Sequence, residues 1–505
     1  MAKRVDSGLG DARRVAVIDV GSNSIRLAVF DGAVRVPVPL FNEKIVSALG
    51  RGMMESGHLN PEGVALAKVG LARFVTLARA MKVDSLHVLG TAAVRAAADG
   101  KAFVDALEDT LGVRVEILTG RAEAALAALG VTCGIPDADG LMGDLGGGSL
   151  NIVHLDRGRI AEQASLPLGL LWLEEQSAGD AHRARRLVDD RLAELPWLKR
   201  IEGRALYPVG GAWRTLANIS INQANYPLRV IDSYRIPRAD AERLVGLMSQ
   251  LSRATLSKIP GVSSRRVDGL RFAALLLDRV LAATRPKVVV FSANGMREGR
   301  FFKSLSPAMR RVDPLLGACL AQVRNSRRFG IGGKELAAWL KPLFPGRDRD
   351  AERLRLAACH LSDIAWSEHP DHRADIAFER ILHLPFTGLG HADRAFLALS
   401  VGSRYGRGVV DHPVVSALLD ESRRDEARGL GVALRLAYTV SGGVAGVIGQ
   451  SRLKRSGHTL TLVVPANRPL FSGDVIERRL QSAARVFGLK ASIAPSRAKR
   501  RSRRS

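Results

Sequence analysis

The chain has 505 residues, 46% of them hydrophobic and 25% charged, so it is long enough for several packed domains and too apolar to be disordered. Its 75 Lys and Arg against 50 Asp and Glu give a net charge of +25, which favours polyanionic partners such as nucleic acid, an anionic membrane surface or phosphate-rich compounds. The alternative explanation of this charge is a genome whose base composition favours Arg codons.

The sequence argues against secretion and membrane insertion. No apolar run reaches the length of a membrane span, and the N-terminal residues lack the apolar core of a signal peptide. The three cysteines, Cys133, Cys319 and Cys359, do not have the spacing of a zinc site or a redox pair. We therefore expect a cytoplasmic protein.

Residues 14–127 alternate strands with helices and follow a flexible N-terminus over 1–13. The predicted strands cover 15–19, 25–30, 85–89 and 113–117. The predicted helices cover 61–80 and 101–111, and a third begins at Arg121. This alternation predicts an α/β domain with a central sheet.

A second α/β domain is predicted over residues 128–305, with strands at 141–144, 149–155 and 159–165. Beyond it, residues 306–490 are predicted to be mainly helical with a small α/β part, in which 431–443 and 458–466 resemble strands. Residues 491–505 form a basic tail that we expect to be disordered.

One pattern occurs twice. "VAVIDVGSNSIRLAVF" at 15–30 and "LMGDLGGGSLNIVHL" at 141–155 both consist of an apolar run, Asp, an apolar residue, Gly, two small residues, Ser and a second apolar run. Each copy predicts a strand that ends near an Asp, a tight turn and a returning strand. Small side chains in such turns let backbone N–H groups approach an anion closely. Neither copy has the sequence of a P-loop. Because the pattern occurs twice, the pair predicts a duplicated fold whose two turns bind phosphate from opposite sides.

These motifs resemble the actin/Hsp70/sugar-kinase (ribonuclease H-like) fold and, within it, the exopolyphosphatase/guanosine pentaphosphate phosphohydrolase (Ppx/GppA) family. Further segments fit the family in the same order: "LGTAAVRAAADG" at 89–100, "EILTGRAEAALAALGV" at 116–131, "YPVGGAWRTLANI" at 207–219 and "FSANGMREG" at 291–299. The resemblance covers about residues 14–305. The remainder is more loosely similar to the helical, degenerate HD-like extension of the longer exopolyphosphatases.

The resemblance implies roles for individual residues. Glu123 would be the catalytic base, although without the resemblance it is an ordinary first-turn Glu favoured by the helix dipole. Asp144 would position water or metal as a second catalytic group. The implied phosphate-binding residues are Gly21, Ser22, Asn23, Ser24, Arg95, Gly146, Gly147, Gly148, Ser149, Gly210 and Gly211, with Arg95 as a guanidinium clamp. The implied cofactor is Mg²⁺, with Asp19, Asp144 and Asn151 as candidate ligands.

Some positions depart from the family's pattern. Ala122 and Asn151 stand where the family usually has acidic residues, and Asn151 keeps an oxygen ligand without the charge, so we expect weaker attraction of Mg²⁺ and slower activity. In the C-terminal extension, Ser362 precedes Asp363 where a metal-dependent HD phosphohydrolase has a His-Asp pair. We therefore do not expect a working metal site from Asp363 and its neighbours His360, His369 and His372.

The leading hypothesis is an Mg²⁺-dependent exopolyphosphatase that releases orthophosphate from the ends of inorganic polyphosphate. The alternatives are hydrolysis of guanosine pentaphosphate (pppGpp) at its 5′ end, and a regulator that binds polyphosphate or an alarmone but scarcely cleaves it. A sugar-kinase-like phosphotransferase is less favoured because the sequence shows no sugar pocket. A homodimer, and non-specific contact of the basic tail with nucleic acid, remain open.

Overall fold

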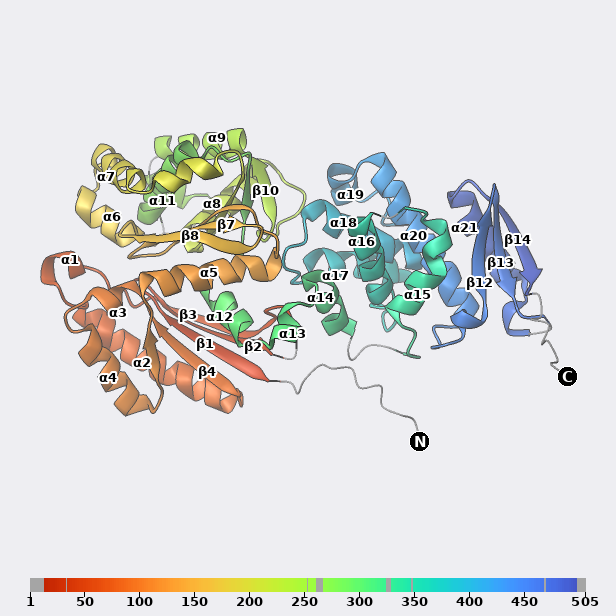
Figure 1. Ribbon diagram of the computed structural model, residues 1–505, viewed down its shortest axis with the longest axis horizontal. Helices are drawn as coiled ribbons and strands as arrows, with labels where there is room; N and C mark the ends of the chain where they lie inside the picture. The colour runs from red at the N-terminus through yellow and green to blue at the C-terminus, as the bar shows by residue number, and fades with distance from the viewer. Residues whose placement is uncertain are drawn as a thin grey trace. The chain divides into compact units, whose positions relative to one another are not determined.

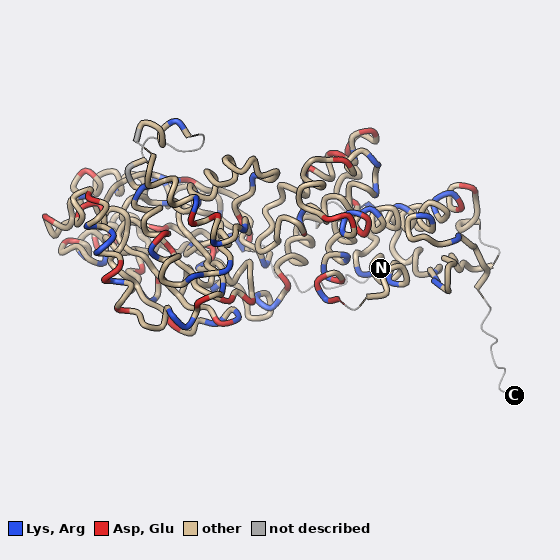
Figure 2. The backbone as a smooth tube through the Cα atoms, turned by 90° about the horizontal axis from the view of Figure 1, so that it is seen from above, with Lys and Arg blue, Asp and Glu red and all other residues tan. Residues whose placement is uncertain are grey.

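The computed structural model describes residues 13–32, 34–251, 253–259, 267–323, 328–346, 348–466 and 469–496. The chain forms two compact units, Met1–Pro314 and Leu315–Ser505 (Figure 1). Lys and Arg are interspersed with Asp and Glu along the backbone of both units (Figure 2). Within the described ranges, no helix combines the length and the apolar character that a membrane crossing requires.

The first sheet of unit 1 has five strands in the order β3-β2-β1-β4-β5. They are β1 (Arg14–Val20), β2 (Ile25–Asp31), β3 (Pro39–Ile45), β4 (Ser85–Gly90) and β5 (Val115–Ile117). β1 is central and rich in β-branched residues that are buried on both faces, as expected for a strand covered from two sides. One face packs against helices α2 (Pro61–Ala80) and α4 (Gly100–Leu111).

The second sheet has six strands in the order β10-β11-β9-β6-β7-β8. They are β6 (Gly140–Leu145), β7 (Leu150–Asp156), β8 (Arg159–Leu166), β9 (Ala205–Val209), β10 (Tyr234–Pro237) and β11 (Val288–Phe291). Its outer face carries α6 (Leu170–Ser177), α7 (Ala181–Ala193), α8 (Gly211–Gln223), α9 (Arg238–Gln250) and α11 (Val267–Thr284) (Figure 1). The fully buried Trp213 joins α8 to α11, since its Nε1–H donates to the Ala273 carbonyl at 2.9 Å.

The two sheets repeat one arrangement, which confirms the predicted duplication. In each, an antiparallel hairpin is followed by a third antiparallel strand on one side and a parallel strand on the other, so β3-β2-β1-β4 corresponds to β8-β7-β6-β9. The two Gly-rich stretches occupy equivalent turns, β1–β2 and β6–β7.

Helices α5 (Gly120–Gly134) and α12 (Met296–Ser304) lie between the sheets, close to two predicted domain limits. Leu126 of α5 packs with the first sheet, whereas Ala127 packs with the second. The expected break at 127 therefore falls inside a helix that both domains share. The other limit, at 305, is also displaced, because α12 packs against β1 and unit 1 continues to Pro314. Small residues around the whole of α5 permit this double contact, and they leave no polar face that would mark a boundary.

A close helix crossing holds α5 and α12 together. A Cβ added to Gly299 would collide with the Leu126 carbonyl, and one added to Gly130 would collide with the Gly295 carbonyl. Because these obstacles are backbone atoms, we expect Gly299→Ala to lower the free energy of unfolding by about 1–3 kcal/mol. Gly246→Ala in α9 is the matched control, since its Cβ meets nothing within 4 Å and should leave stability equal or higher. Urea unfolding of both variants checks this, and equal midpoints would refute the tight crossing.

Unit 2 is helical with a small sheet. Its longer helices are α14 (Pro314–Val323), α15 (Gly333–Leu340), α16 (Arg349–Leu361), α17 (Arg373–His383), α18 (His391–Tyr405), α19 (Pro413–Leu418), α20 (Glu421–Ser441) and α21 (Asp474–Val486). The sheet has the order β12-β13-β14, from Arg452–Ser456, Thr459–Val464 and Lys490–Pro495. The predicted strand at 458–466 is thus confirmed as β13.

Two predictions for unit 2 are wrong. Residues 431–443, expected as a strand, belong mainly to α20, where Leu430, Leu434, Ala437 and Ser441 are buried at helical spacing. In so short an apolar run, the spacing of apolar residues in a helix cannot be distinguished from their alternation in a strand. Residues 491–495, expected as the start of a disordered tail, instead belong to β14, which pairs in parallel with β13. Residues 497–505, which carry most of the basic tail, lie outside the described residues.

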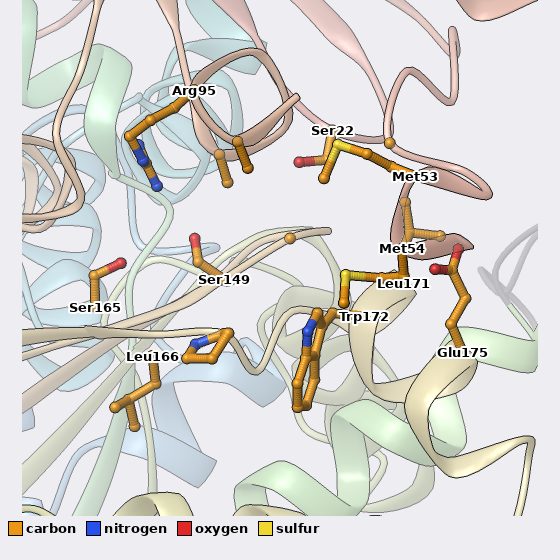
Figure 3. Close-up of a pocket in the computed structure, with 15 residues that line it drawn as sticks. Ser22, Met53, Met54, Arg95, Ser149, Ser165, Leu166, Leu171, Trp172 and Glu175 are labelled. Carbon is orange, nitrogen blue, oxygen red and sulfur yellow. The ribbon is translucent and has the colours of Figure 1, made fainter. Parts of the chain in front are cut away.

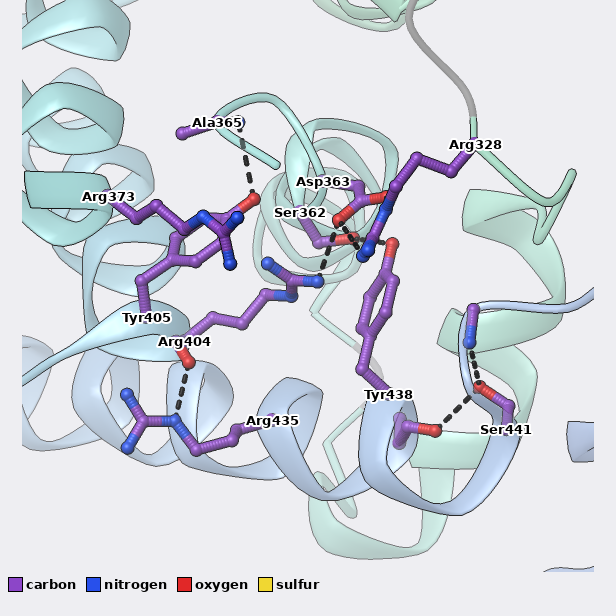
Figure 4. Close-up of polar contacts among 12 residues, drawn as sticks. Arg328, Ser362, Asp363, Ala365, Arg373, Arg404, Tyr405, Arg435, Tyr438 and Ser441 are labelled. Carbon is purple, nitrogen blue, oxygen red and sulfur yellow. Dashed lines mark hydrogen bonds and ion pairs between the residues drawn. The ribbon is translucent and has the colours of Figure 1, made fainter. Parts of the chain in front are cut away.

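Asp363 lies at the centre of an arginine cluster in unit 2 (Figure 4). Arg328 donates to both its carboxylate oxygens at 3.0 Å, and Arg404 donates to Oδ1 at 2.8 Å. Arg404 also lies over the rings of Tyr405 and Tyr438, 4.2 and 3.8 Å from their centroids. Two guanidinium groups therefore pair with the carboxylate that the sequence resemblance aligned with the Asp of an HD metal site.

We expect Asp363→Ala to destabilise unit 2 by about 3–5 kcal/mol, because the buried Arg404 would lose its counter-charge. The exposed Asp371→Ala is the control, with an expected change within about 0.5 kcal/mol. Thermal unfolding of the full chain measures both. A melting profile for Asp363→Ala that matches the control would show that the cluster does not stabilise the fold.

Candidate active site

The first hairpin turns directly after Asp19. Its turn closes with the Gly21 N–H donating to the Ser24 carbonyl at 3.1 Å. A neighbouring loop fixes it from outside: the Gly50 N–H donates to the Ser22 carbonyl at 2.8 Å and the Ala48 N–H donates to the Asn23 carbonyl at 3.1 Å. Backbone hydrogen bonds alone therefore hold the turn in place, and none of them uses a side chain of the turn.

The second hairpin repeats this geometry after Asp144. The Gly146 N–H donates to the Ser149 carbonyl at 3.0 Å, at the position equivalent to the first turn. Its outer support comes from the start of α6, whose Leu170 and Leu171 N–H groups donate to the Gly146 and Gly147 carbonyls at 3.1 and 2.9 Å. Both turns thus keep their inner side available for a ligand.

The two turns touch each other. A Cβ on Gly147 would lie 3.3 Å from Ser22 Cβ, and a Cβ on Gly148 would lie 2.8 Å from Ser22 Oγ. The glycines of the second turn therefore make room for the first. Ser22 and Ser149 are each only 5% exposed at this contact.

A cavity of about 340 Å³ opens between the two halves of unit 1 beside these turns. It brings together most of the predicted site residues, namely Asp19, Gly21, Ser22, Asn23, Ser24, Glu123, Asp144, Gly146, Gly147, Gly148, Ser149, Gly210 and Gly211. The start of α8 lies on its wall, where Gly210 takes a φ of 108° with no side-chain cap for the helix. Exposed N–H groups at such a helix start favour anions.

Glu123 lies in the first turn of α5, which Thr119 caps by accepting from the Ala122 N–H at 3.1 Å. Its side chain is almost buried, and Arg95 Nη1 donates to its Oε2 at 3.2 Å. Arg95 is itself held by the Leu118 carbonyl at 2.6 Å. Burial raises the pKa of Glu123, and the charge of Arg95 opposes this rise only in part. A carboxylate with a raised pKa is suited to accept a proton near neutral pH.

Three carboxylates meet in the cavity. Burial, together with the charges of Glu123 and Asp19, raises the pKa of Asp144 to about 7. Burial also raises the pKa of Asp19, although Arg297 and Arg26 oppose this. The mutual repulsion of these groups would be relieved by a cation or by protons.

Comparison with protein-family models shows to which family this chain belongs. Residues 11–308 match the model of the Ppx/GppA phosphatase family, and residues 333–494 match a model described as exopolyphosphatase, C-terminal. The chain belongs to the Ppx/GppA phosphatase family. Similar proteins include Exopolyphosphatase 2 of Mycobacterium tuberculosis, 28% identical over 300 residues that span 54% of this chain and 92% of the relative. Retrograde regulation protein 2 of Saccharomyces cerevisiae is 24% identical over 446 residues, or 78% and 73% of the two chains.

Solved structures show the same fold as this Ppx/GppA protein. An exopolyphosphatase from Cytophaga hutchinsonii has a TM-score of 0.53 and 24% identity over 58% of this chain and 99% of its own. The Aquifex aeolicus member of the Ppx/GppA family has a TM-score of 0.50 and 22% identity over 58% and 97%. They confirm the expected actin-like duplication in unit 1, and the helices of unit 2 confirm the mainly helical C-terminal region.

Arg95 of this Ppx/GppA protein faces a second, smaller cavity of about 280 Å³ rather than the main one. Figure 3 shows Arg95, Ser149 and Ser165 at one end of it, and Met53, Met54 and Trp172 towards the other. The two cavities share Ser22 and Ser149. Arg95 thus lies beside Glu123 at their border, where its role as a phosphate clamp stays a prediction.

The acidic groups of the cavity fit Mg²⁺. Asp19 and Asp144 offer hard carboxylate oxygens, and Mg²⁺ in phosphate chemistry usually takes one or two carboxylates and fills its other positions with water and phosphate. In the parts of the chain that the structure describes, no group of three or more His, Cys, Asp and Glu side chains forms a complete metal cage. Asn151, the third predicted ligand, lies beneath the cavity at 1% exposure, and its Oδ1 has no hydrogen-bond partner.

The sequence-based prediction missed the cationic residues of the cavity wall. Arg26, Lys44, Arg51, Arg214 and Arg297 line it together with five acidic side chains. Strand alternation could have placed Arg26 on the same face as Asp19. The others come from elements whose approach to the hairpins is set only by the tertiary fold.

Proposed function

We propose that this protein is an exopolyphosphatase, which hydrolyses the terminal phosphoanhydride bond of inorganic polyphosphate and releases orthophosphate. The observation that carries the proposal is the contact between two Gly–Ser turns beside Glu123, which offers donors and a base around one small volume. The name of the Mycobacterium tuberculosis relative and the match of the C-terminal region to an exopolyphosphatase model support this substrate.

The proposed reaction is an in-line displacement. Glu123 accepts a proton from water as the water oxygen bonds to the terminal phosphorus. The bridging P–O bond breaks, and its electron pair stays on the shortened chain. Backbone N–H groups and hydroxyls of the two turns hold the non-bridging oxygens, and the guanidinium of Arg95 orients Glu123 through the contact at 3.2 Å.

Asp19 and Asp144 would hold the Mg²⁺ that we propose as cofactor. When bound, the ion supplies positive charge against the phosphate oxygens. The buried Asn151 brings a neutral amide rather than a negative charge, which supports the expectation of modest metal affinity.

A second candidate is the 5′-hydrolysis of pppGpp, and the smaller cavity favours it. Its wall contains the Trp172 ring with Met53 and Met54, against which a flat base could stack while phosphates reach Ser149. Release of phosphate by the purified chain with Mg²⁺, from long-chain polyphosphate and from pppGpp side by side, separates the two. Faster turnover of polyphosphate supports the main proposal, whereas hydrolysis of pppGpp alone would replace it.

Homodimerisation and a cytoplasmic location stay predictions. The same holds for nucleic-acid contact through the basic tail, most of which lies outside the described residues.

A further inference from the structure

The C-terminal end of the chain carries a large share of its positive charge. Residues 442–505 contain 14 Lys and Arg against 2 Asp and Glu, so they supply about half of the net charge of +25. Within this segment the structure places the strands β12, β13 and β14 and the helix α21. Positive charge gathered in this way favours a polyanion as the partner of this part of unit 2.

The three-stranded sheet has one covered face and one open face. Helix α21 packs against β13 and β14, and Leu453, Leu460 and Leu462 of the sheet are buried. Alternation along each strand places the residues between these leucines on the opposite face. The pairing register arranges that face as three rows, Arg452 with Val463 and Ala494, Lys454 with Thr461 and Ser492, and Ser456 with Thr459 and Lys490. Five of these nine residues are exposed.

The open face combines cations with hydroxyl groups. Arg452, Lys454 and Lys490 supply its positive charge, and four of the other six residues are Ser or Thr. The nine residues include no acidic and no aromatic side chain. Among the described residues, no carboxylate forms an ion pair with any of the three cations. The face therefore offers unpaired positive charge to an anion from outside the chain.

The spacing of the three cations suits phosphates that are separated along a backbone. Arg452 and Lys454 are two residues apart on β12, which is about 7 Å along the strand. Lys490 lies two strands away, about 10 Å across the sheet. In nucleic-acid complexes Lys and Arg contact phosphates, while Ser and Thr contact phosphate and sugar oxygens. Inorganic polyphosphate carries a charge on every unit and has no sugar, so this mixture of cations and hydroxyls favours a nucleic acid.

The lack of aromatic side chains on the face favours a duplex. Surfaces for single strands stack bases on aromatic rings. Duplex RNA is instead bound through its phosphates and 2′-hydroxyls, largely without reading the sequence. Additional positive charge follows directly after the sheet, because Ser496 donates its N–H to the Val464 carbonyl at 2.7 Å and residues 497–505 contain six Lys and Arg.

We propose that the open face of the β12-β13-β14 sheet binds double-stranded nucleic acid through its backbone. Arg452, Lys454 and Lys490 contact phosphates, and the hydroxyl side chains between them contact sugars. Binding of this kind does not depend on base sequence. It is separate from the proposed hydrolysis, which takes place in unit 1.

The test measures equilibrium binding of the full chain to short fluorescent duplexes of RNA and of DNA, each in two unrelated sequences. The triple variant Arg452→Gln, Lys454→Gln, Lys490→Gln should raise Kd about tenfold for both sequences. The slope of log Kd against log salt should fall by about 3, one for each phosphate contact.

A second triple variant, Lys68→Gln, Arg186→Gln, Lys199→Gln, is the matched control. It removes the same charge from exposed positions of unit 1 that line neither cavity, and its Kd should stay within about twofold of the wild type. Unchanged melting temperatures of both variants confirm that the fold is intact.

Equal Kd values for the two triple variants would overturn the proposed surface. Binding of long-chain polyphosphate but of neither duplex would overturn it as well, since the cations would then serve a different polyanion. Weaker binding of either duplex by the first variant alone sustains the proposal, and the ratio of RNA to DNA affinity then identifies the preferred backbone. A wild-type chain that releases no phosphate would end the proposed function and leave this test unaffected.

Discussion

Glu123→Gln is expected to lower kcat for phosphate release by about 10²–10⁴-fold, because the amide cannot accept the proton of the attacking water. Binding of polyphosphate should be kept or become tighter, since Gln preserves the shape and removes one negative charge from the cavity. Initial rates of phosphate release and an equilibrium titration with polyphosphate measure the two quantities on the same preparation.

Glu62→Gln is the matched control for this prediction. Glu62 also lies in the first turn of a helix, α2, but it is exposed and away from the cavity. If Glu123 were only a first-turn residue favoured by the helix dipole, both variants would lose a little stability and keep their activity. Full activity of Glu123→Gln would remove this residue from the mechanism.

Asp144→Asn is expected to raise the stability of the metal-free protein and to lower its activity. Burial and two neighbouring carboxylates raise the pKa of Asp144 from 3.8 to about 7, so between these values the folded state binds more protons than the unfolded state. The free energy of unfolding of the metal-free protein should therefore fall as pH rises from about 4 to about 7. Asn carries no charge, so the variant should be more stable at pH 8 by up to about 4 kcal/mol and lose most of its activity.

Denaturant unfolding at pH 4, 6 and 8, with and without Mg²⁺, measures this effect. Mg²⁺ should stabilise the wild type above pH 7, where Asp144 is ionised, and should stabilise Asp144→Asn much less. The exposed Asp137→Asn is the control and should leave the pH dependence unchanged. A wild-type stability that rises between pH 6 and pH 8 without metal would contradict the raised pKa.

The sequence was sufficient to predict the hairpins, because residues adjacent in the chain determine their geometry. An apolar run, an Asp, small turn residues and a second apolar run determine the geometry from Asp19 to Arg26 and from Asp144 to Asn151. Residues far from the hairpins could be added only through the family resemblance, which placed Glu123 and the Gly210–Gly211 turn in the same cavity.

The features that were missed depend on contacts across the fold. β3 is half-exposed, and its sequence PLFNEKI does not alternate apolar with polar residues, so this strand escaped prediction. The pairing of Lys44 with Arg26 was therefore hidden as well. Helix α5 was cut at 127 because its burial between two sheets leaves no amphipathic signal. The burial of Asn151 beneath the cavity likewise follows from α5 packing on β7.

The most direct test of the proposed activity is the product distribution from long-chain polyphosphate, followed by ³¹P NMR with the purified full chain and Mg²⁺. Hydrolysis at chain ends predicts that the orthophosphate signal grows while the internal-phosphate signal shrinks, and that the end-group signal does not rise, because each cut leaves the number of chain ends unchanged. A rise of the end-group signal before orthophosphate appears, as internal cleavage would give, or an unchanged spectrum, would contradict an exopolyphosphatase built on these two hairpins.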